Sequence, residues 1–298
     1  MDAAIFNNEQ ILRWLTYFAD NADLDLAKVK ILDITRKNKN LLPTVASNRS
    51  VLVFTDAGHP QIFYDMWDAG MGDCEIWYNE GSNPTGPIKH DKLQDMIDRG
   101  INASAAMLII NPDARSTYKI GIDNQNFSTG SIHYVGSEIR AVIMNKLHVD
   151  AQDVILTVSA ASIAVEAAMI ANEGTIIDVE YGQRDRDTME ENILKFGLRN
   201  VSVLPAVTEE TMAGQPVPSL AFIVASDQVE AEIQCLKKIN PEMKFIFYTL
   251  NFGWLSKLPE IMVANGIDPK EVIQVQISKL NSKNAFDIQP APWLISGE

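Results

Sequence analysis

Residues 153–170 read DVILTVSAASIAVEAAMI, and this segment constrains the fold more than any other part of the chain. The apolar, β-branched run from Val154 to Val158 is typical of a buried strand, and the alanine-rich residues after it favour a helix. A strand that leads directly into a helix is the unit from which parallel α/β sheets are built. In nucleotide-binding sheets the connecting turn is rich in glycine, but this chain has no glycine between Gly136 and Gly174. The segment therefore predicts such a sheet with an altered turn.

The charge and composition exclude several classes of protein. The 298 residues contain 25 Lys and Arg against 39 Asp and Glu, a net charge of −14. We expect no nucleic-acid partner and no membrane partner, because an anionic surface would be repelled. The 2 cysteines and 4 histidines do not have the spacings of metal ligands, so we expect no metal. The chain begins without the pattern of a signal peptide, and residues 153–171 are too polar for a membrane span, so the expected location is the cytoplasm.

Strands and helices alternate in the first part of the chain. The patterns predict strands at 28–35, 50–58, 74–80 and 105–112, and helices near 8–20, at 59–70 and at 91–100. Such alternation implies parallel pairing with right-handed crossovers. A polar stretch over 121–137 is interpreted as a linker or crossing loop. We predict a smaller α/β domain with a mixed sheet over residues 1–130.

The second part of the chain predicts a larger α/β domain over residues 131–298. A helix over 136–149 is followed by strands at 153–158, 175–180, 201–205, 219–226 and 245–250, with helices at 162–171, 187–196, before Pro241 and near 254–265. Residues 271–280 and 292–297 are expected to form an antiparallel pair at one edge of the sheet. Seven strands with such a closing pair indicate a Rossmann-like class I S-adenosylmethionine-dependent methyltransferase domain, with other doubly wound folds as the alternative.

Two segments resemble enzymes of cobalamin synthesis that methylate precorrins. Residues 136–298 resemble the decarboxylating cobalt-precorrin carbon-15 methyltransferases through SEIRAVIMNKLHVDAQDV, SIAVEAA, EENILKFGLRNVSVL and the terminal EVIQVQISK and QPAPWLISG. Residues 28–115 resemble the carboxyl-terminal half of the precorrin carbon-5 methyltransferase through NLLPTVASNRSVLVFTDAGHPQIFYDMWDAGMGDCEIWYNE. In that family the two enzymes are often fused in this order. The resemblance implies S-adenosylmethionine as cofactor, a tetrapyrrole corrin precursor as substrate, and a homo-oligomer.

The resemblance also implies where the cofactor would bind. The family has an acidic residue and a Gly-x-Gly-x-Gly loop, whereas this chain has Thr157 in place of the acid and Ser159, Ala160, Ala161 and Ser162 in place of the loop. The side chains of the two alanines would occupy space in which bare backbone must approach the ligand. The loop is therefore expected to be short and degenerate.

Two further positions complete the implied cofactor site. Glu180 matches the family carboxylate that accepts hydrogen bonds from the ribose hydroxyls, although a solvated strand-end carboxylate is the alternative interpretation. Ala206 follows Pro205 where the family has the Gly-Asp-Ala that contacts adenine. The residues at 224–228 replace a glycine-rich turn of the family. Three of the four regions that would contact the cofactor therefore depart from the family pattern.

Precorrins carry many carboxylates, so a cleft that binds them needs local cations. Arg140, Lys279 and Lys283 are the candidates for substrate binding, with solvated surface charges as the alternative interpretation. The sequence assigns no catalytic residue. Two hypotheses remain open: an active methyltransferase that acts on a corrin precursor, and a non-catalytic family member that serves as a binding or scaffolding subunit.

Overall fold

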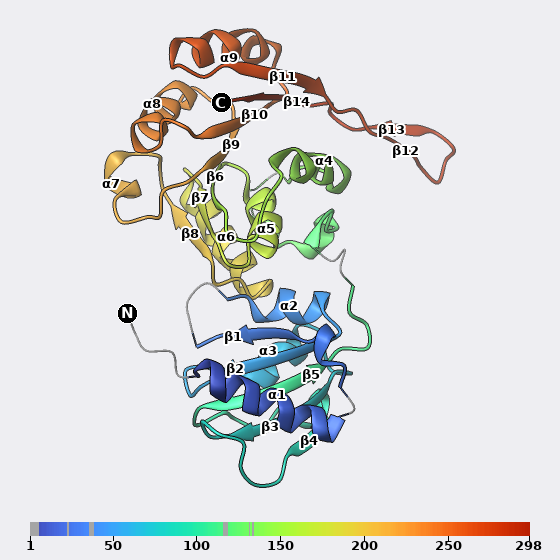
Figure 1. The fold of residues 1–298 in the computed structure, drawn as a ribbon. Helices are drawn as coiled ribbons and strands as arrows, with labels where there is room; N and C mark the ends of the chain where they lie inside the picture. The colour runs from blue at the N-terminus through green and yellow to red at the C-terminus, as the bar shows by residue number, and fades with distance from the viewer. Residues whose placement is uncertain (1–5, 23, 36–38, 116–118, 131, 133) are drawn as a thin grey trace. The chain divides into compact units, whose positions relative to one another are not determined.

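The computed structural model of the protein describes residues 6–22, 24–35, 39–115, 119–130, 132 and 134–298. The chain divides into two compact units, one of residues 1–119 and 195–199 and the other of residues 120–194 and 200–298. Each unit contains its own β-sheet (Figure 1). Among the described residues, no helix combines the length and the apolar character that crossing a lipid bilayer requires.

The first unit is a five-stranded mixed sheet with helices on both faces. Its elements are α1 (Asn8–Ala22), η1 (Leu26–Lys28), β1 (Lys30–Asp33), α2 (Leu41–Ser47), β2 (Ser50–Thr55), α3 (Ile62–Asp68), β3 (Glu75–Glu80), β4 (Lys89–Lys92), η2 (Leu93–Asp95) and β5 (Ala105–Ile110). The strand order is β1-β2-β5-β3-β4. Side chains alternate along β2, so Leu52 and Phe54 pack with Trp14 of α1, while Val51 and Val53 pack with α2 and α3 on the other face.

Two expectations for this unit are wrong. The sheet is mixed as expected, but the parallel pairing implied by the alternation is found only for β1–β2 among the described residues, whereas β2–β5, β5–β3 and β3–β4 are antiparallel. The helix expected at 91–100 is absent, because β4 pairs with β3 and leads into the short η2. Leu93 and Met96, three residues apart, are both fully buried. A single tight turn places two such residues on the same side, as a helix does, so their spacing does not distinguish the two.

The second unit has the predicted seven-stranded class I methyltransferase-like sheet. Its elements are η4 (Asn124–Asn126), α4 (Ser137–Leu147), β6 (Val154–Val158), α5 (Ala161–Ile170), β7 (Thr175–Val179), α6 (Gln183–Lys195), β8 (Val201–Leu204), α7 (Glu209–Met212), β9 (Leu220–Val224), α8 (Val229–Ile239), β10 (Lys244–Thr249), α9 (Phe252–Ala264), β11 (Pro269–Gln274), β12 (Ser278–Leu280), β13 (Phe286–Ile288) and β14 (Trp293–Gly297). The order is β11-β14-β10-β9-β6-β7-β8, and β14 runs antiparallel to both its neighbours. The closing antiparallel pair is confirmed, but β11 ends at Gln274 and the next strand joins a separate hairpin with β13.

The strand order fixes where a ligand would be expected. The chain runs from β6 outward to β7 and β8, and then returns to β9 on the other side of β6. The connections from β6 and from β9 therefore leave in opposite directions, and in open α/β sheets ligands are expected at the carboxyl ends of two such strands. The turn after β6 and the loops after β7 and β9 line this edge of the sheet.

The polar stretch 121–137 is fastened to the second unit. The backbone N–H groups of Gly121 and Ile122 donate to the Glu166 carboxylate in α5. The N–H of Ser128 donates to the Asn192 side chain in α6 at 2.8 Å. This stretch, whose residues 131 and 133 lie outside the described residues, therefore differs from a free linker. The domain boundary between residues 130 and 131 stays a prediction.

Candidate functional site

The turn between β6 and α5 is the centre of the candidate site. Val158 ends β6 and Ala161 begins α5, so the predicted strand, short turn and helix are confirmed. Ser159 has a left-handed backbone with φ of 53°, a conformation that favours glycine. Ala160, Ala161 and Ser162 are all buried. The turn thus retains a backbone shape suited to glycine while its side chains fill the space beside it.

Glu180, directly after β7, is turned into the protein beside this turn. The side chain is only 4% exposed, and its Oε1 has no hydrogen-bond partner among the described residues. Burial, reinforced by the nearby Asp178 carboxylate, raises the pKa of Glu180 to about 8, while hydrogen bonding from the N–H groups of Ala161 and Ala160 partly opposes the rise. The carboxylate is therefore held at the beginning of α5 and offers little surface to a ligand.

Asp178 lies in β7, two residues before Glu180. It is fully buried, and it accepts a hydrogen bond of 2.6 Å from the Thr157 hydroxyl of β6. Its Oδ2 finds no partner among the described residues. Burial raises the pKa of Asp178 to about 7, and the hydrogen bond from Thr157 acts against the rise. Thr157, which the resemblance implies replaces an acid of the family, thus serves to satisfy a buried carboxyl group.

Tyr181 and Glu232 link the two strands that flank β6. The Tyr181 hydroxyl, which follows β7, donates to Oε1 of Glu232 in α8, and α8 follows β9. Because β6 lies between β7 and β9, the pair joins the segments that follow the two strands on either side of β6. Glu232 is 1% exposed and burial raises its pKa, whereas Tyr181 is 39% exposed.

Arg140 lies inside the second unit, whereas a substrate-binding residue was expected to be accessible. Its side chain is fully buried, and its Nε donates to the Glu166 carboxylate at 2.7 Å. The remaining donors contact Asn124 Oδ1 and the carbonyl oxygens of Ile122 and Val135. This placement corrects the expectation, because an arginine with its donors used inside the protein presents no surface to a substrate.

The other predicted residues are dispersed. Lys279 lies in β12 and contacts the Glu138 carboxylate of α4 at 2.5 Å, which lowers the pKa of Glu138. Lys283 lies in the turn between β12 and β13. Ala206 follows the edge strand β8, and its carbonyl accepts a hydrogen bond from the Thr211 hydroxyl. Of the predicted cofactor residues, the structure gathers the β6–α5 turn and Glu180 at one place.

The sequence analysis missed Asp178, Tyr181 and Glu232. A signal for the first was present, because Asp178 stands two residues before Glu180, and residues two apart along a strand face the same side. Glu232 carries no such signal, since its contact with Tyr181 crosses 51 positions of sequence.

No protein-family model and no curated protein matches the chain. Solved structures do match it. A precorrin-6Y C5,15-methyltransferase from Geobacter metallireducens GS-15 has 25% identity and a TM-score of 0.56, over 60% of this chain and 97% of that one. Precorrin 8W decarboxylase from Methanobacterium thermoautotrophicum has 16% identity and a TM-score of 0.53, over 59% and 99%.

The C-terminal domain of a precorrin-6Y C5,15-methyltransferase from Rhodobacter capsulatus has 15% identity and a TM-score of 0.51, over 60% of this chain and 98% of that one. The two matches below 25% identity support the fold alone. Together the structures confirm the resemblance to precorrin methyltransferase and decarboxylase domains for the part of the chain that they cover. The resemblance of residues 28–115 to the carbon-5 enzyme stays a prediction.

Proposed function

We propose that the chain is a protein of the precorrin methyltransferase type that binds a corrin precursor but does not carry S-adenosylmethionine. The order of the seven strands and the similarity to precorrin enzymes support the first part. The buried position of Glu180 carries the second part. A carboxylate that accepts hydrogen bonds from a ribose must reach the ligand, and this one is 4% exposed and held against the beginning of α5.

The lost contacts account for a large loss of affinity. Each hydrogen bond to a polar ligand group contributes about 1 kcal/mol, and the family loop, acid and adenine contact would supply several. Because each 1.4 kcal/mol is about tenfold in affinity, a micromolar site weakens to about millimolar. The methyl groups of Ala160 and Ala161, both buried at the turn, add a steric cost. The residues present therefore do not fit the cofactor in this conformation.

An active methyltransferase is the second candidate function. It is favoured by the unpartnered Oε1 of Glu180, a buried acceptor at the position that the family uses for the ribose. Such an enzyme would act mainly by proximity, aligning a methyl group with a nucleophilic ring carbon of the corrin precursor.

Calorimetric titration of the full chain with S-adenosylmethionine and S-adenosylhomocysteine separates the two functions. We expect no binding at about 100 μM ligand, and no change in Glu180→Ala. The double variant Ala160→Gly/Ala161→Gly serves as a matched test, since it removes both methyl groups. A low-micromolar dissociation constant in the wild type that is lost in Glu180→Ala would establish the active enzyme instead.

The tetrapyrrole part of the proposal has its own test. Uroporphyrin, a tetrapyrrole with many carboxylates, can be titrated while the tryptophan fluorescence is recorded. We expect quenching that weakens in Lys279→Ala and Lys283→Ala, because both remove a cation. Lys238→Ala, which removes an exposed cation of α8, is the control and should bind as the wild type does. Absence of quenching in the wild type would contradict corrin-precursor binding.

A further inference from the structure

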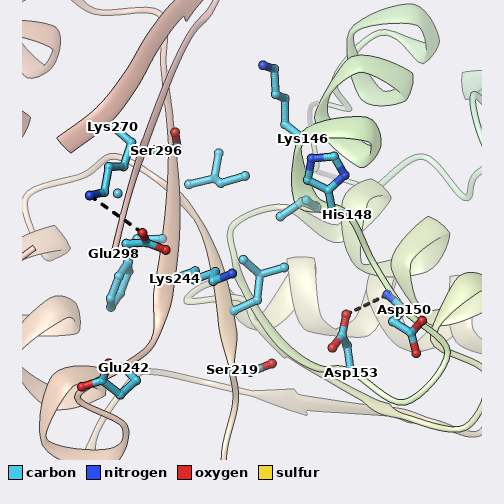
Figure 2. Close-up of a pocket in the computed structure, with 15 residues that line it drawn as sticks. Lys146, His148, Asp150, Asp153, Ser219, Glu242, Lys244, Lys270, Ser296 and Glu298 are labelled. Carbon is cyan, nitrogen blue, oxygen red and sulfur yellow. Dashed lines mark hydrogen bonds and ion pairs between the residues drawn. The ribbon is translucent and has the colours of Figure 1, made fainter. Parts of the chain in front are cut away.

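A cavity of about 520 Å³ lies at the opposite edge of the sheet of the second unit. It opens where β9 and β10 begin, next to the residue that precedes β6, and the end of α4 forms one wall (Figure 2). No residue of the β6–α5 turn or of the loop after β7 lines it. Its volume is within the range of small-molecule sites, about 300–1,000 Å³. The cavity is thus separate from the candidate site described above.

Lys244 is the central cation of this cavity. The side chain extends from the first residue of β10 into the middle of the cavity, toward the wall that bears His148 (Figure 2). Among the described residues, no carboxylate lies within 4.0 Å of its ammonium group. His148 ends α4 in a left-handed conformation with φ of 49°. This backbone turn places the imidazole on the wall of the cavity.

The other two lysines of the lining already have partners. Lys146 contacts the Glu271 carboxylate at 2.7 Å. Lys270 contacts the carboxylate of Asp268 at 2.8 Å and that of Glu298 at 3.8 Å. Their charges are neutralised within the protein, which leaves Lys244 to meet a ligand.

Carboxylates line the same cavity. Asp150 and Glu242 have no lysine or arginine at ion-pair distance within the described part of the chain. Asp153 accepts a hydrogen bond of 2.7 Å from the N–H of Asp150. Between the charged groups lie the buried apolar side chains of Leu220 and Phe245. The cavity thus presents one unpaired cation, three carboxylates without a lysine or arginine partner (Asp150, Asp153 and Glu242) within the described part of the chain, and an apolar floor.

This mixture of charges restricts the class of ligand. A simple anion would be attracted by the lysine but repelled by the carboxylates. A simple cation would be attracted by the carboxylates but repelled by the lysine. A molecule with both an ammonium and a carboxylate group can satisfy both at once, because each charged group then has an opposite charge nearby. We propose that this cavity binds a zwitterion of dipeptide size, with its carboxylate on Lys244, its ammonium toward Asp150, and an apolar side chain on Leu220 and Phe245.

Three dipeptide probes test the proposal on the full chain. Leucyl-leucine carries both charges, N-acetyl-leucyl-leucine lacks the ammonium group, and leucyl-leucinamide lacks the carboxylate. In calorimetric titrations we expect leucyl-leucine to bind with a dissociation constant below about 1 mM, and each capped probe to bind at least about tenfold more weakly.

Lys244→Met tests the assigned contact. It should weaken leucyl-leucine about tenfold and leave the binding of leucyl-leucinamide unchanged, because the amide makes no ion pair with the lysine. Lys238→Met replaces an exposed lysine of α8 that does not line the cavity, and it should bind all three probes as the wild type does. The proposal fails if leucyl-leucine does not bind at about 10 mM, if capping has no effect, or if Lys244→Met leaves binding intact. The cofactor titration concerns the other edge of the sheet, so the two results are independent.

Discussion

The Arg140 guanidinium and the Glu166 carboxylate form an ion pair of 2.7 Å in which neither side chain is exposed. The carboxylate also accepts the N–H groups of Gly121 and Ile122, and the guanidinium donates to the Ile122 carbonyl. The pair thus fastens the segment that precedes α4 to both α4 and α5. In this protein the arginine that the sequence offers to a substrate is used to hold the chain together.

Removing one partner of this pair should strongly destabilise the protein. We expect Glu166→Leu and Arg140→Met each to lower the free energy of unfolding by about 3–5 kcal/mol, because each leaves a buried charge without its partner. The double variant should lose less free energy of unfolding than the two single variants together, since it leaves neither buried charge of the pair in place. Urea unfolding monitored by circular dichroism measures all three. Single variants within about 1 kcal/mol of the wild type would contradict the assigned role.

The buried carboxyl groups should make stability depend on pH. The pKa of Asp178 rises from 3.8 to about 7, and that of Glu180 rises from 4.5 to about 8. The folded state therefore binds more protons than the unfolded state between these values, so this contribution to stability is fully present below about pH 4 and is lost as the pH rises through 7 and 8. We expect the urea midpoint to fall from about pH 6 to about pH 9.

Asp178→Asn tests the origin of this dependence. The amide keeps an acceptor for the Thr157 hydroxyl but cannot ionise, so the variant should be more stable than the wild type at about pH 9, by on the order of 3 kcal/mol, and nearly equal at low pH. Asp227→Asn, at an exposed carboxyl in the loop after β9, should change the stability neither at about pH 9 nor at low pH. If the urea midpoint of Asp178→Asn changes with pH as steeply as that of the wild type, the pH dependence arises from other groups.

The sequence predicted the sheet of the second unit because its strands are continuous β-branched runs such as 154–158, whose burial does not depend on distant partners. The helix at 91–100 was wrong because local spacing does not tell a tight turn beside a strand from a short helix. The burial of Arg140 could not be predicted from local sequence, since its partner Glu166 lies 26 positions away in α5. The inward position of Glu180 could not be predicted either, because a strand-end carboxylate can turn to either side. Local pattern thus predicts elements, whereas tertiary contacts decide what their polar residues do.

Ser159→Gly should stabilise the protein. Ser159 has φ of 53°, and a non-glycine residue in the left-handed region costs about 1–2 kcal/mol. Glycine also loses more freedom on folding, by about 0.5–1 kcal/mol, so a net gain of about 0.5–1 kcal/mol is expected in urea unfolding. Ser162→Gly makes the same change at the second residue of α5 and should destabilise the protein by about 0.5 kcal/mol, the difference in helix propensity between the two residues. A loss of stability in Ser159→Gly would show that the serine side chain stabilises the turn.

The hairpin of β12 and β13 carries an exposed apolar face on which a homo-oligomer could form. The hairpin of β12 and β13 pairs Leu280 with Phe286, and Ile288, two residues further along β13, shares their face. All three side chains are at least 60% exposed, and Figure 1 shows the hairpin extending from the end of β11 away from the seven-stranded sheet.

A two-stranded hairpin is only marginally stable in water, and its stability rises when its apolar face is covered. A second copy of the chain can cover it symmetrically, because the same face then meets itself. We therefore expect size-exclusion chromatography with light scattering to give a mass that is a multiple of 33.1 kDa, and Phe286→Ser/Ile288→Ser to give the monomer. Leu194→Ser, which removes an equally exposed apolar residue from α6, should leave the mass unchanged. A monomeric wild type, or an oligomer that survives the double substitution, would show that this face of the hairpin does not hold copies of the chain together.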